Sequence, residues 1–183
     1  MADRTKIPEI NGIGGIKLID PEIVTLDNGI RLGIIRDKSL EFVRLHIALK
    51  GGRKRQRKPL AANFTVRLMD IGSKTMTREE IAEKVDYMGT VFAGNATSDA
   101  GNTKIYMNAL SRYTQKSLDI LEMLIKEGTY PQKEVDVELQ KSLAIKKMYD
   151  EQVGQMASKR LGEAMFGKRS YYGSFATDDD FTE

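Results

Sequence analysis

The spacing of hydrophobic residues in the first third of the chain predicts three β-strands. Two short apolar runs flank Asp-Asn-Gly at 27–29, residue types that supply the positive φ angles of a tight hairpin turn. Strands are therefore predicted near 22–26 and 30–36. The stretch EFVRLHIALK, residues 41–50, alternates apolar and polar positions, which predicts a third strand. Its buried face would carry Val43, Leu45, Ile47 and Leu49.

Two helices are predicted to follow. In PLAANFTVRLMDIG, residues 59–72, Pro59 suits a first helical turn and Gly72 suits a stop. The apolar positions between them have helical spacing: Leu60, Phe64, Leu68 and Ile71. The next helix begins with a capping box formed by Thr77 and Glu80, and Gly89 ends it.

The second half of the chain predicts one more hairpin and two more helices. The hairpin strands lie near 90–97 and 102–110. A helix capped by Ser111 would turn Leu118, Leu121, Leu124 and Ile125 inward. One long helix would run from Pro131 to about residue 166, weakened around Gly154. This order of elements predicts an α+β fold, a mostly antiparallel sheet covered by helices on one face.

Length and composition limit the domain organisation and the location. The chain has 183 residues, 40% of them hydrophobic and 30% charged, which suits one globular domain. We expect an extended lead-in over residues 1–20 and a single half-domain over 21–183. No apolar run approaches the roughly 20 residues that span a membrane, and the first ten residues lack the apolar core of a secretory signal. We therefore expect a cytoplasmic protein without disulfides, since the chain has no cysteine.

A basic loop follows the third strand. The segment KGGRKRQRK, residues 50–58, suits a solvated loop or a contact for an acidic peptide or an acidic partner surface. A nucleic-acid contact is the alternative, but no aromatic residue interrupts the loop and the net charge of the whole chain is only +3. The candidate binding residues are Arg53, Lys54, Arg55, Arg57 and Lys58.

Several of these segments, in this order and at these spacings, resemble the N-terminal half-domain of the pitrilysin/insulinase-type zinc peptidases, which include the mitochondrial processing peptidase. The matching segments are LDNGIRLGIIRD, ALKGGRKRQRKPLAANF, GSKTMTREEIAEKVDYMGT, SLDILEMLIKEGTYPQKEVDVE, KKMYDE and AMFGKRSYYG. The resemblance runs from about Ile23 to Gly173. It implies a six-stranded, mostly antiparallel sheet backed by helices. Family half-domains continue with another helix and strand, so we expect a longer natural protein, with Thr177 as a candidate cap of that helix.

The resemblance also implies which positions would hold zinc in an active member. Those members carry His-x-x-Glu-His on the helix after the glycine turn and a third, acidic ligand on the later long helix. Here the three motif positions hold Asn63, Val66 and Arg67. The third-ligand position falls near Ile145, where residues 143–145 contain no carboxylate, although Glu138 matches an acidic position of the family.

These substitutions argue against catalysis by this chain. Zinc prefers histidine, carboxylate or thiolate ligands, whereas Asn63 is a weak neutral donor and Arg67 is a permanent cation. Val66 cannot transfer a proton. The single histidine, His46, is predicted to be packed or exposed on its strand rather than to be a ligand. We therefore expect no metal and no catalytic residue. Arg67 is either an ordinary exposed residue or a fixed cation that pairs with Glu138 across the former metal site.

Three functions remain open at this stage. The first is a catalytically inactive homologue that binds peptide or supports an active subunit or second half-domain. The second is a part of a longer active zinc peptidase whose metal site lies outside this chain. The third and least favoured is nucleic-acid binding through the basic loop. An open sheet edge would in addition allow pairing with a second copy.

Overall fold

A computed structural model describes residues 18–37, 39–96 and 101–181 of the chain. The chain forms two compact units, Met1–Leu40 and Glu41–Glu183. Most of the predicted lead-in lies outside the described residues. Each unit is described by itself below.

The described part of the first unit contains the predicted hairpin. Strands β1 (Glu22–Thr25) and β2 (Arg31–Ile34) pair antiparallel, with Glu22 opposite Ile34. In the turn, the Gly29 amide donates to the Leu26 carbonyl at 2.8 Å, and Gly29 has a φ of 81°. The sequence prediction for this hairpin is confirmed, because the turn needs the positive φ that glycine adopts without strain.

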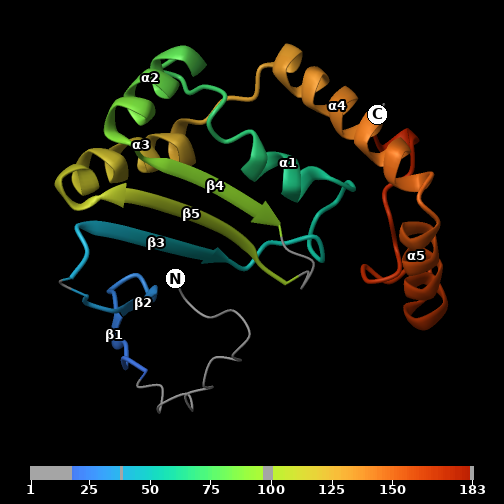
Figure 1. The fold of residues 1–183 in the computed structure, drawn as a ribbon, viewed down its shortest axis with the longest axis horizontal. Coiled ribbons are helices and arrows are strands. Elements are labelled where there is room, and N and C mark those ends of the chain that lie inside the picture. Colours follow the sequence, from blue (N-terminus) through green and yellow to red (C-terminus); the bar gives the residue numbers. More distant parts are fainter. Residues whose placement is uncertain (1–17, 38, 97–100, 182–183) are drawn as a thin grey trace, which may run out of the picture. The chain divides into compact units, whose positions relative to one another are not determined.

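The second unit is built on a three-stranded antiparallel sheet (Figure 1). Its strands are β3 (Phe42–Leu49), β4 (Val91–Ala96) and β5 (Thr103–Leu110), in the order β3-β5-β4. The structure confirms both hairpin strands, and residues 97–100 between them lie outside the described residues. Within the described part of the chain β4 pairs with β5 alone, so β4 is an edge strand of this sheet.

Three helices cover one face of this sheet and enclose the core. They are α1 (Ala61–Arg67), α2 (Arg78–Met88) and α3 (Thr114–Glu127). Figure 1 shows all three on the same side of the strands. The core residues come from each of these helices and from the inward face of β5: Val66, Met69, Ile81, Met88, Ile105, Met107, Ala109, Ile120, Leu121 and Leu124. This arrangement confirms the α+β class, because each helix buries one apolar face against one sheet face.

The strongest local signals hold in detail. The Thr77 hydroxyl accepts from the Glu80 amide, and the Glu80 carboxylate accepts from the Thr77 amide, so the capping box that starts α2 is complete. Gly89 ends α2 in the left-handed conformation with a φ of 60°. In β3, Val43, Leu45 and Ile47 face inward as predicted, while Leu49 at the end of the strand is exposed.

Helix α1 is shorter than the predicted 59–72 helix. It begins at Ala61, because Leu60 adopts a left-handed conformation with a φ of 69°, and it ends at Arg67. Its predicted apolar stripe is nevertheless buried. Phe64, Leu68 and Ile71 form a second, smaller core cluster that packs against α4 (Gln132–Asp150). This cluster fixes α4 beside α1.

The predicted long helix from Pro131 to 166 is wrong. The chain leaves the helical path at Gln152, which has a ψ of 114°, and resumes as α5 (Val153–Phe166). The break falls two residues before Gly154, where an ion-pair cluster joins the two helices. Lys146 and Lys159 both pair with Asp150, the last residue of α4. In the described ranges, no helix is long and apolar enough to cross a membrane.

Helix α3 also departs from its prediction. Ser111 starts a 3-10 turn over Ser111–Tyr113, and α3 itself begins at Thr114 without a side-chain cap. Leu121 and Leu124 are buried as predicted, but Ile125 lies on the exposed side.

Near the end of the chain, a second 3-10 turn over Asp179–Phe181 follows Thr177, whose amide and hydroxyl both donate to the Asp180 carboxylate.

Candidate functional site

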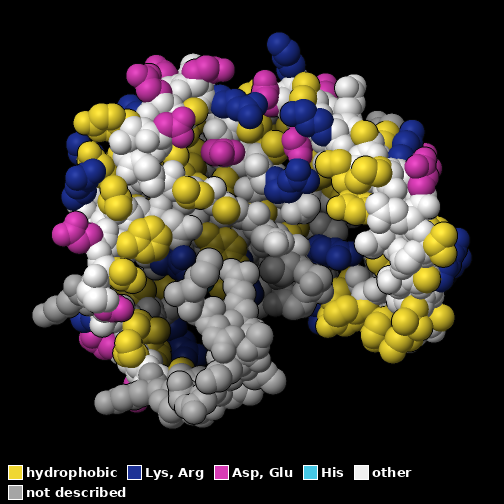
Figure 2. Space-filling model, viewed as in Figure 1, with side chains coloured by type: hydrophobic (Ala, Val, Ile, Leu, Met, Phe, Trp, Pro, Cys, Tyr) yellow, Lys and Arg dark blue, Asp and Glu magenta, His cyan; other side chains and the backbone are white. Residues whose placement is uncertain are grey.

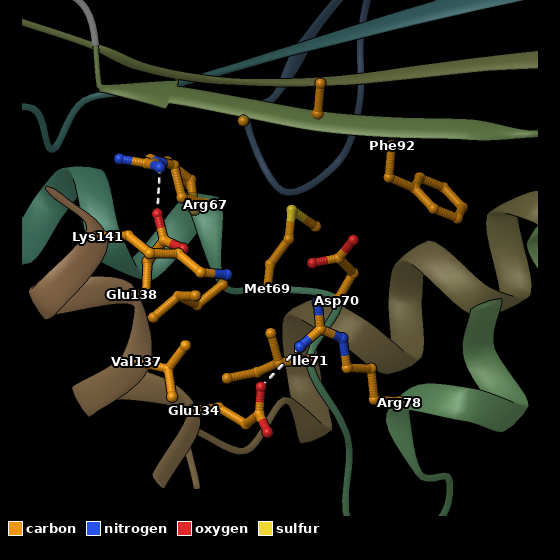
Figure 3. A pocket seen from close by; sticks show the side chains of 14 residues that line it. Arg67, Met69, Asp70, Ile71, Arg78, Phe92, Glu134, Val137, Glu138 and Lys141 are labelled. Atoms are coloured by element: carbon orange, nitrogen blue, oxygen red, sulfur yellow. Dashed lines mark hydrogen bonds and ion pairs between the residues drawn. The ribbon is translucent and has the colours of Figure 1, made fainter. Parts of the chain in front are cut away.

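A cavity of about 370 Å³ lies between the end of α1, the edge strand β4 and helix α4. Its charged lining is balanced, with three basic and three acidic side chains. Figure 3 shows them converging from α1, α4 and the start of α2. They are Arg67, Arg78, Lys141, Asp70, Glu134 and Glu138. The α4 members recur at i, i+4 and i+7, so one face of that helix points into the cavity.

Arg67 holds the α1 side of this cavity to α4. Its guanidinium forms an ion pair with Glu138, and its second terminal nitrogen lies 3.4 Å from the Ser142 hydroxyl (Figure 3 draws the ion pair). The side chains are 39% and 18% exposed, so the pair is partly shielded from water. The guanidinium also lies over the Phe64 ring, 5.8 Å from its centroid. Arg67 is therefore oriented by contacts on both helices.

A second ion pair closes the far end of the same cavity. Arg78 lies 2.6 Å from Glu134, and both side chains are more exposed than the first pair. Tyr130 lies in the loop between α3 and α4 and donates to the Thr65 carbonyl at 3.0 Å, which connects this loop to α1. Burial raises the pKa of Tyr130, so its hydroxyl keeps the proton that this hydrogen bond needs.

Val66 also lines this cavity but is packed into the core. Its side chain is buried, and it belongs to the main core cluster. The backbone of β4 approaches it closely at Gly94, where a Cβ atom would lie 2.5 Å from the Val66 Cβ. Val66 is therefore part of the packing between α1 and β4. The resemblance assigns the catalytic glutamate of active peptidases to this position.

Asn63 lies in different surroundings from Arg67, although the two are one turn apart. It lines a second cavity, of about 480 Å³. Asn95 of β4 and Arg53 of the basic loop line the same cavity. Asn63 and Arg67 share a face of α1, as the sequence predicts, but they line separate cavities.

These residues do not fit zinc. The Glu138 carboxylate is engaged by Arg67, a permanent cation that would also repel a dication. Val66 offers no donor atom, and Asn63 opens into the other cavity. In the part of the chain that the structure describes, no three His, Cys, Asp or Glu side chains lie close enough together to share a metal ion.

The five candidate binding residues of the basic loop divide into two groups. The Arg53 guanidinium donates to the Ser174 carbonyl at 3.3 Å, and the Lys54 ammonium lies 5.7 Å from the centroid of the Tyr171 ring. These two side chains anchor the loop to the C-terminal segment. The remaining three are exposed and form no ion pair within the described residues: Arg55, Arg57 and Lys58.

Sequence reasoning missed several charged residues of the first cavity and one hydrogen-bond partner of Arg67. The missed residues are Lys141, Ser142 and the Arg78–Glu134 pair. The spacing of Glu134, Glu138 and Lys141 along the sequence could have indicated that they share one face of α4. The exposed His46 packs edge-on against Tyr106, its neighbour across the sheet, with ring centroids 4.7 Å apart.

An antiparallel sheet with helices on one face, and an ion pair between α1 and α4, have the arrangement expected of a zinc-peptidase half-domain. The family model Insulinase (Peptidase family M16) matches residues 42–178. The chain therefore belongs to peptidase family M16. This result confirms the resemblance seen in the sequence.

Solved structures share the fold at low sequence identity. A peptidase M16 inactive domain from Pseudomonas fluorescens is 16% identical with a TM-score of 0.77, over 87% of this chain and 39% of that one. A protease from Helicobacter pylori is 17% identical with a TM-score of 0.71, over 90% and 40%. The periplasmic protease PqqL from Escherichia coli is 10% identical with a TM-score of 0.73, over 100% and 21%. The chain thus spans well under half the length of these proteins.

Proposed function

We propose that this chain is a catalytically inactive M16 homologue that binds peptide or supports an active subunit or second half-domain. The observation that carries the proposal is the Arg67–Glu138 ion pair at the former metal position. A carboxylate held by a guanidinium is not available as a ligand, and the valine at the base position is committed to the core. The scaffold keeps its shape through an ion pair that does not need a metal.

The same residues argue for a bracing role at this position. Arg67 and the small core cluster of Phe64, Leu68 and Ile71 act on the same pair of helices, α1 and α4. Apolar packing supplies most of the attraction. The ion pair of Arg67 with Glu138 and its hydrogen bond to Ser142 fix the relative orientation of the two helices. In an assembly of two half-domains, α1 and α4 would keep their relative position while an active partner carries out peptide hydrolysis.

Peptide binding is supported by the edge strand. Within the described residues β4 pairs on one side only, so its other side presents backbone amides and carbonyls that an extended peptide could pair with. Both cavities open beside β4, one at Gly94 and one at Asn95. Alternate side chains of a bound peptide would then have recesses to enter.

The free cations of the basic loop favour acidic peptides. Arg53, from the start of the loop, lines the cavity beside Asn95, and three further loop cations have no partner within the described residues. Their attraction for a negative peptide should fall with ionic strength over the 50–200 mM range, where the Debye length shortens from roughly 14 to 7 Å. The family relation supports a protein partner, but its identity stays open, and the cytoplasmic location stays a prediction.

A binding titration tests this proposal. The probe is a short fluorescein-labelled peptide of alternating glutamate and valine, with a lysine–valine peptide of the same length for comparison. We expect salt-sensitive binding of the acidic peptide, weakened about tenfold or more by reversing Arg55, Arg57 and Lys58 to glutamate. A matched triple reversal of exposed lysines elsewhere should have little effect: Lys74, Lys116 and Lys133.

The outcomes of this titration separate the alternatives. No binding of either peptide, or equal loss in both triple variants, would contradict the peptide-binding proposal. Duplex DNA of random sequence serves as the third probe. Binding of DNA in preference to the acidic peptide would favour the nucleic-acid alternative.

A further inference from the structure

Helix α5 turns its apolar side away from the rest of the unit. Val153, Leu161 and Met165 are 85%, 60% and 65% exposed. Together with the exposed Ala157 they recur at every fourth position and form one stripe along the helix. In Figure 2 hydrophobic side chains gather over the lower end of α5. A surface helix normally buries such a stripe, but this one has no partner among the described residues.

The opposite side of α5 explains why the stripe cannot turn inward. Lys159 pairs with Asp150 and lies over the Phe175 ring, 6.0 Å from its centroid. At Gly162 a Cβ atom would lie 3.3 Å from the same ring and 3.4 Å from the Tyr172 carbonyl oxygen. The charged and small residues of α5 therefore face α4 and the C-terminal segment. Rotating the helix would break these contacts.

The exposed stripe is complementary to itself. If a second α5 lies antiparallel with its midpoint at position 159, Ala157 of one copy faces Leu161 of the other, and Val153 faces Met165. Each large side chain thus meets a smaller one. Gly154 would face Ala164, and nothing lies within 4 Å of a Cβ atom at Gly154. The helices can therefore approach closely.

Charge at the two ends of α5 is complementary in the same arrangement. Glu151 precedes the helix, and Lys168 and Arg169 follow it; all three are exposed and have no ion pair within the described residues. Antiparallel pairing about position 159 brings the Glu151 end of one copy to the Lys168 and Arg169 end of the other. Parallel pairing would instead place like charges together.

We propose that α5 is a homodimer contact, in which the stripe of Val153, Ala157, Leu161 and Met165 packs antiparallel against the same stripe of a second copy. One helix pair buries less than the roughly 800 Å² per partner of a standard stable complex, so the dimer should be weak, with a Kd on the order of micromolar. This contact is independent of the peptide-binding edge, because α5 lines neither cavity.

Sedimentation velocity over a range of concentrations tests the contact. We expect a monomer–dimer equilibrium that Leu161→Glu shifts to monomer by at least tenfold in Kd, with unchanged circular dichroism. Ile125→Glu, at an exposed apolar position on α3, should leave the equilibrium unchanged. A monomer at all concentrations, or a dimer that Leu161→Glu does not weaken, would overturn the proposal.

Two further variants test the register. Glu151→Lys alone and Lys168→Glu with Arg169→Glu should each weaken the dimer several-fold, and all three changes in one chain should restore much of the affinity. Because the chain has no cysteine, an equimolar mixture of Ala157→Cys and Leu161→Cys chains should form a mixed disulfide faster than either chain alone. Equal cross-linking in all three samples, or no recovery in the triple variant, would contradict antiparallel pairing.

Discussion

Gly94 on β4 and Val66 on α1 approach so closely that a side chain at position 94 has no space. A Cβ atom built there would lie 2.5 Å from the Val66 Cβ and 2.8 Å from the Val66 carbonyl oxygen. Helix α1 therefore rests directly on the edge strand at Val66, the position to which the family resemblance assigns a glutamate. Val66 thus serves the packing between α1 and β4 and carries no group that could transfer a proton.

Replacing Gly94 with alanine should destabilise the protein. The methyl group must displace the backbone of α1, and overpacking of this kind typically costs about 1–3 kcal/mol. Urea denaturation would measure the loss. Gly51→Ala is the control, because nothing lies within 4 Å of a Cβ atom at that glycine, and its effect should be within about 0.5 kcal/mol. Equal effects of the two variants would contradict the contact.

The Arg67–Glu138 pair should show a measurable coupling energy. A double-mutant cycle with Arg67→Met and Glu138→Gln is expected to give about 1 kcal/mol, since the pair is partly shielded and shared with Ser142. The same cycle on the more exposed Arg78 and Glu134 should give less. An unchanged melting temperature in Arg67→Ala would contradict the proposed role of Arg67 in holding α1 to α4.

The junction between α4 and α5 should lose stability in acid. Hydrogen bonds from Lys146 and then Lys159 lower the pKa of Asp150 below its ordinary value. A carboxyl group with a lowered folded pKa stabilises the protein above its unfolded pKa of about 3.9, and this contribution disappears as the pH falls through the folded value. Asp150→Asn should therefore lower the melting temperature at pH 7 and have a progressively smaller effect below about pH 4.

Hydrogen bonds from Lys146 to Asp150 and Asp178 raise the pKa of Lys146. The stability of the same junction should therefore also fall at high pH. That stabilisation is present below the unfolded pKa of about 10.4 and is lost as the pH rises through the folded value. Asp136→Asn on the exposed side of α4 is the control for Asp150→Asn and should change the melting temperature little at any pH. A pH-independent effect of Asp150→Asn would argue against the ionic junction.

Removing the cap of α2 should cost about 1 kcal/mol, with a range of roughly 0.5–2. Thr77→Ala removes the acceptor for the Glu80 amide and leaves that donor without its partner. Thr65→Ala is the matched control, because Thr65 is an exposed residue within α1, where alanine has the higher helix propensity. Chemical denaturation of both variants would show whether the effect is specific to the cap.

The features that the sequence predicted correctly are those set by neighbouring residues. The Asp-Asn-Gly turn at 27–29, the capping box of Thr77 and Glu80, and the stop at Gly89 each depend on a few adjacent positions. The alternation in β3 likewise reports which face is buried. Local chemistry of this kind determines a turn or a helix end wherever the segment is placed.

The features that the sequence did not predict depend on residues far apart in the chain. Helix α4 ends at Asp150, which pairs with Lys159 of α5. The sequence placed the weak point at Gly154, two residues after the observed break at Gln152. The direction of Val66 depends on Gly94, 28 positions later, and a helix wheel does not contain that information. The same holds for the anchoring of Arg53 by Ser174, which leaves fewer free cations in the basic loop than composition suggests.

The most direct test of the central claim is the zinc content of the chain after equilibrium dialysis against zinc, measured by elemental analysis. We expect well under one zinc per chain, with no change in Glu138→Gln, because Arg67 already pairs with the Glu138 carboxylate. One zinc per chain that is lost in Glu138→Gln would contradict it.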